Sequence, residues 1–233
     1  NKRNDSAYYN RGLVRLKKRD LNGAILDFTQ SIELNPKNDM AFTNCGVARF
    51  NGGDLNGAIA DYNKAIELNP RNYFGYYNRA VAWSYKGNYD KAISDITKAI
   101  DINPQDSRGY SYLAWFKYKK KEFEQVIKYA NKAIELNPKD QIAFGTRGWV
   151  RFEMGDENAA KDDLKKSVEL NPNSTNAFFD EGLLHFILAE YEQAITEWNK
   201  VIESSPIDKS DLDPWIKRAK GLSKNTGLTS QAD

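Results

Sequence analysis

Apolar residues recur along the chain at helical spacing, in short blocks that are separated by turn-forming residues. In the stretch 39–72, one block covers residues 42–50 and a second covers residues 58–68, with Gly-Gly-Asp at 52–54 between them. Glycine can take the left-handed conformation that ends a helix, and Pro70 disfavours helical geometry at the residue before it. This stretch therefore predicts two helices joined by a short turn.

The same arrangement repeats every thirty-four residues. The octapeptide NKAIELNP occurs at 63–70 and again at 131–138, and the near match TKAIDINP lies halfway between the copies at 97–104. Six of the seven prolines fall on this period, and an Asp or Asn that can cap the next helix follows the first four of them: Asn38, Asn72, Asp106 and Asp140. One helix pair cannot bury its apolar stripe alone, so the pairs must stack as a solenoid.

The period divides the chain into six units and a C-terminal remainder within one predicted domain, residues 1–222. The units are 5–38, 39–72, 73–106, 107–140, 141–174 and 175–208. Residues 211–222 predict a helix that caps the apolar flank of the last unit, because Asp213-Pro214 reads as a helix start and Trp215 begins an apolar face. The polar residues 223–233 predict a disordered tail.

The order of small and large residues within a unit resembles the tetratricopeptide repeat (TPR) family. Small residues lie at positions 8, 20 and 27, proline at position 32, and an aromatic residue at position 4: Tyr8, Phe42, Tyr76, Tyr110, Phe144 and Phe178. Position 24 departs from the family pattern at Ile96, Ala130 and Leu164. The resemblance implies an all-α, right-handed superhelical solenoid, in which the first helix of each unit lines a concave groove.

Arginines replace the residues that the family usually carries at positions 7 and 11: Arg11, Arg15, Arg49, Arg79, Arg147 and Arg151. The second helices of the same four units carry an aspartate at position 23: Asp27, Asp61, Asp95 and Asp163. We predict arginine–aspartate pairs between the two helices of a unit. A basic stripe for ligand binding is the alternative.

Composition excludes several classes of function. The net charge of +2 is close to balance and gives no reason to expect a nucleic-acid partner. The longest apolar stretch, residues 182–189, is too short to span a bilayer, so we expect a soluble chain without membrane insertion. The single cysteine, Cys45, fits a reducing or an oxidising compartment, with a lean to the cytoplasm. The chain begins at Asn1, which fits an excised fragment or a processed product.

No pattern of catalytic or ligand residues stands out. The single histidine, His185, lies four units from Cys45, which argues against a nucleophile–base pair. Metal-ligand spacing and a glycine-rich phosphate loop are absent from the sequence, so we expect no catalytic, metal or cofactor site.

The resemblance implies that positions 2, 5, 6, 9, 12 and 13 of each first helix face the groove. Asn10, Asn44 and Asn78 share position 6, and their amides could bond a peptide backbone or make local bonds. From unit three onward the positions turn aromatic: Phe74, Tyr77, Tyr85, Tyr112, Trp115, Tyr118, Trp149, Phe152, Phe179 and Phe186. Arg108, Lys119, Glu153 and Asp180 would form a polar rim. The rings either bind a ligand or pack between neighbouring first helices.

These features predict a non-catalytic interaction module that binds an extended or helical peptide in the groove between units three and six. Of the basic residues used by family members that clamp a C-terminal carboxylate, only Arg108 fits, so an internal apolar or aromatic segment is the expected ligand. Trp115→Ala and Trp149→Ala should then weaken binding and leave helical content intact. The alternatives are a self-associating structural unit and the targeting arm of a larger enzyme.

Overall fold

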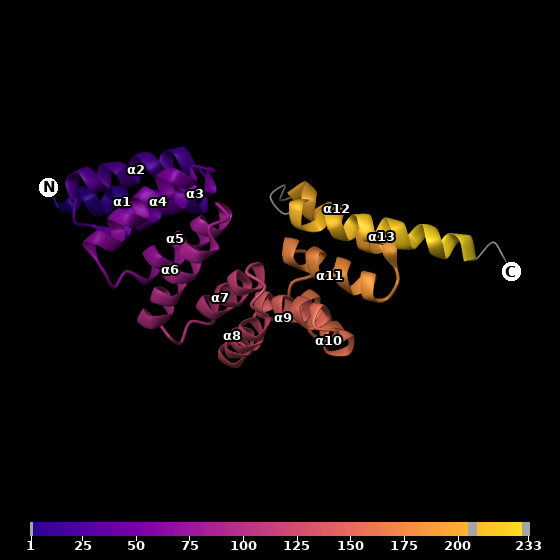
Figure 1. Cartoon of the computed structure of the whole chain (residues 1–233). Coiled ribbons are helices and arrows are strands. Elements are labelled where there is room, and N and C mark those ends of the chain that lie inside the picture. The colour runs from indigo at the N-terminus through magenta and orange to yellow at the C-terminus, as the bar shows by residue number, and fades with distance from the viewer. Residues whose placement is uncertain (1, 205–208, 230–233) are drawn as a thin grey trace. The chain divides into compact units, whose positions relative to one another are not determined.

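The computed structural model describes residues 2–204 and 209–229, and within these ranges it is all-helical, without strands (Figure 1). Each predicted unit contributes two antiparallel helices. The helices are α1 Lys2–Lys17, α2 Leu21–Leu34, α3 Asp39–Asn51, α4 Leu55–Leu68, α5 Tyr73–Tyr85, α6 Tyr89–Ile102, α7 Ser107–Lys119, α8 Phe123–Leu136, α9 Gln141–Glu153, α10 Glu157–Leu170, α11 Thr175–Ile187, α12 Tyr191–Ser204 and α13 Lys209–Thr229.

The chain divides into two compact units, Asn1–Gly109 and Tyr110–Asp233. The boundary between the compact units lies inside α7, and the single domain over residues 1–222 stays a prediction. A stack held by contacts between neighbouring pairs has no single core shared by its ends. Each compact unit therefore has its own set of packed helix pairs.

Side-chain caps begin most of the helices as the sequence predicts. The side chains of Asn38, Asn72 and Asp140 accept hydrogen bonds from the backbone N–H three residues later, at 3.0, 2.7 and 3.1 Å. Asp106 differs, because its carboxylate accepts from the N–H of Arg108 at 3.0 Å. These bonds satisfy donors that the first turn of a helix leaves unpaired.

The turn between the two helices of a pair requires one residue with positive φ. Gly53, Gly87 and Gly155 take φ values of 84°, 73° and 87° at this position. In the other three pairs the position holds residues with a Cβ atom, Arg19, Lys121 and Ala189, at 61°, 58° and 62°. Side chains disfavour this conformation, so these three turns are strained.

Glycine at position 8 lets the second helix approach the first. A Cβ added at Gly12 would lie 2.7 Å from the ring of Phe28, and one added at Gly46 would lie 2.5 Å from the ring of Tyr62. The other glycines at this position, Gly148 and Gly182, meet Leu164 and Trp198 in the same way. The large residue at position 24 thus fills the space above the glycine, which confirms the predicted close approach.

The predicted arginine–aspartate pairs are confirmed in all four units. Asp27 pairs with Arg11 at 2.7 Å and Arg15 at 3.0 Å, Asp61 with Arg49 at 3.0 Å, Asp95 with Arg79 at 2.7 Å, and Asp163 with Arg147 at 2.6 Å and Arg151 at 2.7 Å. Bonding to Arg11 lowers the pKa of Asp27, whereas burial raises the pKa of Asp61. The arginines join the two helices of a pair and do not form a stripe for ligand binding.

The C-terminal helix is longer than the sequence predicts. α13 continues to Thr229, so residues 223–229 are helical where a disordered tail is predicted. Leu222 packs against the core, and the Ser223 Oγ donates a hydrogen bond to Glu192 Oε1 at 2.6 Å. These contacts hold the helix beyond Gly221, and residues 230–233 of the predicted tail lie outside the described residues.

Candidate interaction surface

The groove candidates on the first helices of residues 1–109 include two exposed aromatic side chains, and we group these candidates under the name open face. We define it by the candidate residues that α1, α3 and α5 carry: Asn10, Asn44, Phe74, Tyr77, Asn78 and Tyr85. Phe74 and Tyr85 are 44% and 48% exposed, and they are the two aromatic residues among the exposed large apolar side chains of the described chain. They lie eleven residues apart on α5, which places them on one side of the helix about 16 Å apart.

The three asparagines of the open face differ in their surroundings. The Asn44 Nδ2 donates to Tyr9 Oη at 3.0 Å and to the Met40 carbonyl at 2.9 Å, which is the local bonding that the sequence left as one alternative. Asn10 is exposed and Asn78 is half-buried. The amide of Asn44 is therefore occupied by the fold.

Arg108 stacks at the edge of the open face. Its guanidinium lies 5.6 Å from the centre of the Tyr77 ring and pairs with Asp106 at 2.5 Å. The Tyr73 Oη donates to the same carboxylate at 2.9 Å, and Arg108 holds the pKa of Asp106 below its usual range. Because Arg108 is already neutralised, it is poorly placed to clamp the carboxylate of a ligand.

The corresponding face of residues 110–233 is covered by α13. We define this covered face by Tyr118, Trp149, Phe152, Phe179 and Phe186. Trp149 is 2% exposed, and its ring lies 4.5 Å from Phe179 and 5.7 Å from Trp215 of α13 between ring centres. The expectation that Trp149 is exposed in a groove is therefore wrong. The sequence identifies Trp215 as part of an apolar capping face but does not indicate which rings that face contacts.

The three candidates on α7, Tyr112, Trp115 and Tyr118 of the covered face, are only partly accessible. Trp115 is half-buried beside Phe116 at 5.5 Å, with the Lys119 ammonium 5.5 Å from its ring centre. Tyr112 lies 5.9 Å from Phe116. Burial raises the pKa of Tyr118, whose ring stacks on a neighbouring aromatic residue. This part of α7 resembles the second alternative, in which rings pack between helices.

Asp180 lies in the core and not in the predicted polar rim. It is 4% exposed, and its Oδ1 accepts from Trp149 Nε1 at 3.0 Å while its Oδ2 bonds to Ser167 Oγ at 2.5 Å. Burial raises the pKa of Asp180 to about 7. A side chain at Gly145 would collide with the carboxylate, so this glycine makes room for it. The buried carboxyl thus fixes Trp149 under α13.

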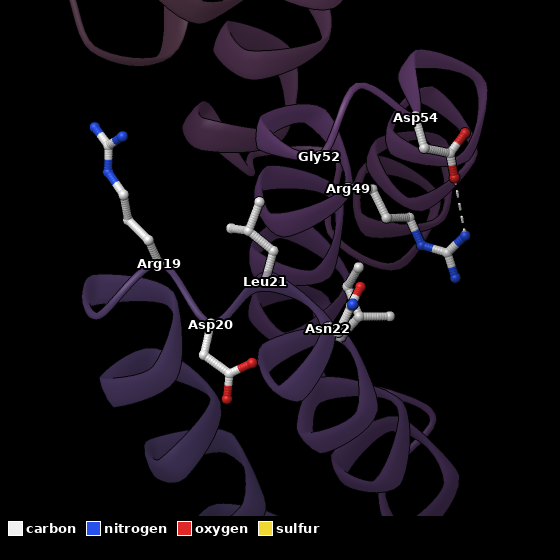
Figure 2. Close-up of a pocket in the computed structure, with 8 residues that line it drawn as sticks. Arg19, Asp20, Leu21, Asn22, Arg49, Gly52 and Asp54 are labelled. Carbon is white, nitrogen blue, oxygen red and sulfur yellow. Dashed lines mark hydrogen bonds and ion pairs between the residues drawn. The ribbon is translucent and has the colours of Figure 1, made fainter.

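A second candidate site is an open depression of about 540 Å³ beside the turns of the first two helix pairs (Figure 2). It contains two arginines, but Arg49 pairs with Asp54 at 3.4 Å and with Asp61 at 3.0 Å. Asp20 and Asp54 cap α2 and α4, and Figure 2 shows the side chains of Arg19 and Asp20 pointing in opposite directions. Asp20, Asp54 and Arg49 are thus engaged in contacts within the fold.

Cys45 and the metal-binding residue types are candidates for reactive chemistry in the described part of the chain. Burial raises the pKa of the Cys45 thiol to about 12, so the thiolate that would act as a nucleophile is scarce at neutral pH. In the described part of the chain, no cluster of three or more His, Cys, Asp or Glu residues could hold a metal ion. None of the helices described is both long and apolar enough to cross a bilayer.

Family models match most of the chain. Models of the tetratricopeptide repeat match residues 6–38, 73–106, 108–140 and 143–174, and a TPR repeat model matches residues 46–83. The chain belongs to the tetratricopeptide repeat family. No curated protein matches this TPR chain in sequence.

Solved TPR structures share the fold. A TPR protein from Parabacteroides merdae is 22% identical with a TM-score of 0.72, and the match covers 93% of this chain and 84% of that one. PilF from Pseudomonas aeruginosa is 16% identical with a TM-score of 0.71, covering 88% and 93%. YrrB, described as a TPR protein with an unusual peptide-binding site, is 24% identical with a TM-score of 0.56, covering 77% and 92%. These neighbours show the fold, and membership of the TPR family supports a protein-interaction scaffold.

Proposed function

We propose that this TPR protein is a non-catalytic scaffold that binds an extended or helical peptide of a partner protein on its open face. The observation that carries the proposal is the exposure of Phe74 and Tyr85 on one side of α5. Exposed aromatic residues on one face are typical of interaction sites, where they supply much of the binding energy. Their separation of about 16 Å matches about five residues of extended chain.

The neighbouring residues supply a polar edge for the same ligand. Tyr85 packs edge-on against Phe50 of α3 at 5.0 Å, which fixes the ring without burying it. Asn78 lies between Phe74 and Tyr85 along α5 and carries a side-chain amide. Paired Arg108 adds a polar group without net charge, so an internal segment fits better than a free C-terminal carboxylate.

A peptide library displayed on phage and selected on the intact chain tests this proposal. Peptides recovered in the selection should bind the Phe74→Ala, Tyr85→Ala double variant at least tenfold more weakly in fluorescence anisotropy. The matched control is Leu26→Ala. Leu26 is 66% exposed but lies on α2, the second helix of its pair, and is not part of the open face. Peptides that bind both variants as tightly as the intact chain would contradict the proposal.

Self-association is a second candidate function, favoured by apolar residues on the first helix pair. Val14, Leu26 and Leu34 are 53%, 66% and 44% exposed on α1 and α2. Sedimentation equilibrium over a hundredfold range of concentration separates the two functions. A mass that rises with concentration and returns to that of the monomer in Leu26→Ser would support assembly, whereas a constant monomer mass would exclude it.

A further inference from the structure

α13 reaches much further than a cap of the last helix pair requires. Trp215 lies among four rings: Trp149 at 5.7 Å, Phe152 at 5.8 Å, Phe186 at 5.5 Å and Trp198 at 6.3 Å between ring centres. These rings come from α9, α11 and α12. A helix that only shielded the α11–α12 pair would need no contact with α9.

The sequence of α13 fits this surface as a ligand helix fits a groove. Leu212, Ile216 and Ala219 are 0%, 8% and 0% exposed, and Leu222 continues the same stripe. Asp213, Lys217 and Lys220 on the other side are exposed. Apolar anchors at spacings of four and three residues are the pattern by which an amphipathic helix binds a groove on another protein.

Polar contacts in the first turn of α13 and at Ser223 set its direction. Asp211 in the first turn pairs with Lys119 of α7, and Ser223 bonds to Glu192 of α12. Reversing the helix would move the acidic residue away from Lys119. The covered face thus specifies an acidic residue followed at defined distances by leucine, tryptophan and isoleucine.

We infer that the covered face is a helix-binding site, that α13 is its resident ligand, and that a partner helix with the same pattern competes for it. The pattern is an acidic residue followed by Leu at +1, Trp and Ile at +4 and +5, and Ala at +8, as in residues 211–219. Lys119 selects the acidic residue, and the four aromatic rings around Trp215 select the tryptophan. Because α13 is tethered, its high effective concentration keeps the site masked from weaker helices.

The inference extends the proposed function but uses a different compact unit, so each can fail alone. The test uses a fluorescein-labelled peptide of residues 209–224 and the full-length chain. Trp215→Ala weakens the resident helix, and this chain should bind the peptide at least tenfold more tightly than the intact chain in fluorescence anisotropy. The Phe74→Ala, Tyr85→Ala chain, altered on the open face, should bind it as the intact chain does.

A charge reversal tests the specificity. In the Lys119→Glu chain the peptide with Asp211→Lys should bind more tightly than the unmodified peptide, and in the chain with Lys119 this order should reverse. This variant removes the ion pair with Asp211 and the contact of Lys119 with the Trp115 ring but leaves the aromatic rings around Trp215 in place, so it serves also if Trp215→Ala disrupts folding. Equal affinities for the two peptides would overturn the inference.

Two results of the Trp215→Ala experiment would also overturn it. One is unchanged peptide affinity in a variant whose far-ultraviolet circular dichroism shows full helical content. The other is a concentration-dependent dimer in the absence of peptide, because a second copy would then fill the vacated face.

Discussion

Pairs of charged residues join the two helices of a unit. The loss of stability on removing one partner measures this role. Asp163 pairs with both Arg147 and Arg151, and its carboxylate is buried. Removing it leaves two guanidinium groups between helices without their anion.

Asp163→Ala should lower the free energy of unfolding by about 3 kcal/mol, the cost of breaking a buried pair on one side. The neighbouring exposed Asp162 provides the control, and Asp162→Ala should change stability by less than about 0.5 kcal/mol. Urea denaturation followed by circular dichroism measures both. Equal losses for the two variants would argue that the pairs add nothing.

Asp180 should make stability depend on pH. Its pKa of about 7 in the folded chain exceeds the value of about 3.9 in an unfolded chain, so the folded state holds more protons between these values. Its contribution to stability is therefore present at low pH and is lost as pH rises from about 4 to about 7.

Asp180→Asn keeps an acceptor for Trp149 Nε1 but cannot ionise, so its stability should fall less over this window. The variant should also be more stable than the intact chain at pH 8. Melting temperatures measured from pH 4 to pH 8 test this. A larger decline in the asparagine variant than in the intact chain would contradict the assigned role of the buried carboxyl.

Substitutions at the turn position with positive φ should change stability in opposite directions. Lys121→Gly should stabilise the chain by roughly 1 kcal/mol, because glycine takes φ 58° without a steric penalty. Gly87→Ala should destabilise it by a similar amount, since a Cβ at Gly87 meets no neighbouring atom and only its φ of 73° opposes the side chain. Chemical denaturation of both variants measures the difference, and changes of the same sign would refute the explanation.

At the scale of one helix, α13 depends on the residues beneath it. Trp149 is buried between Phe179, Trp215 and Asp180. Trp149→Ala should therefore destabilise the chain by about 3–5 kcal/mol and not merely weaken binding.

Exposed Phe74 is the matched control, and Phe74→Ala should change stability by less than about 1 kcal/mol. Hydrogen exchange locates the effect, because the amides of 212–222 should lose protection in Trp149→Ala while those of α3 do not. Unchanged protection of α13 would mean that the aromatic rings around Trp215 do not hold this helix.

Across the whole molecule, periodic features were predictable and unique ones were not. The thirty-four-residue period fixes the helix pairs, and the position of Asp163 opposite Arg147 and Arg151 predicts their contact. Features that occur once carry no such signal. The direction of α13, and hence the burial of Trp149, depends on contacts with α7 and α9 that lie far away in sequence.

The burial of Trp149 and Asp180 could not be predicted for the same reason. Position within a unit groups Phe74 and Trp149 together as residues of first-helix faces, yet Phe74 is exposed and Trp149 is covered. The repeat predicts the surface that the stacked helix pairs form. Which part of that surface is exposed depends on α13, which lies outside the repeat. Leu212, Trp215 and Ile216 are the residues that cover this face. Their apolar character indicates that they are buried but does not indicate against which surface.

In this chain α13 covers one aromatic face of first helices, whereas Phe74 and Tyr85 on another remain exposed. Nuclear Overhauser spectroscopy of the full-length chain tests this arrangement most directly, through the indole protons of Trp215. Cross-peaks are expected from Trp215 to the rings of Trp149, Phe152 and Phe186, because the ring centres lie 5.5–5.8 Å apart. A Trp215 ring that shows no cross-peak to any of these residues would contradict this arrangement.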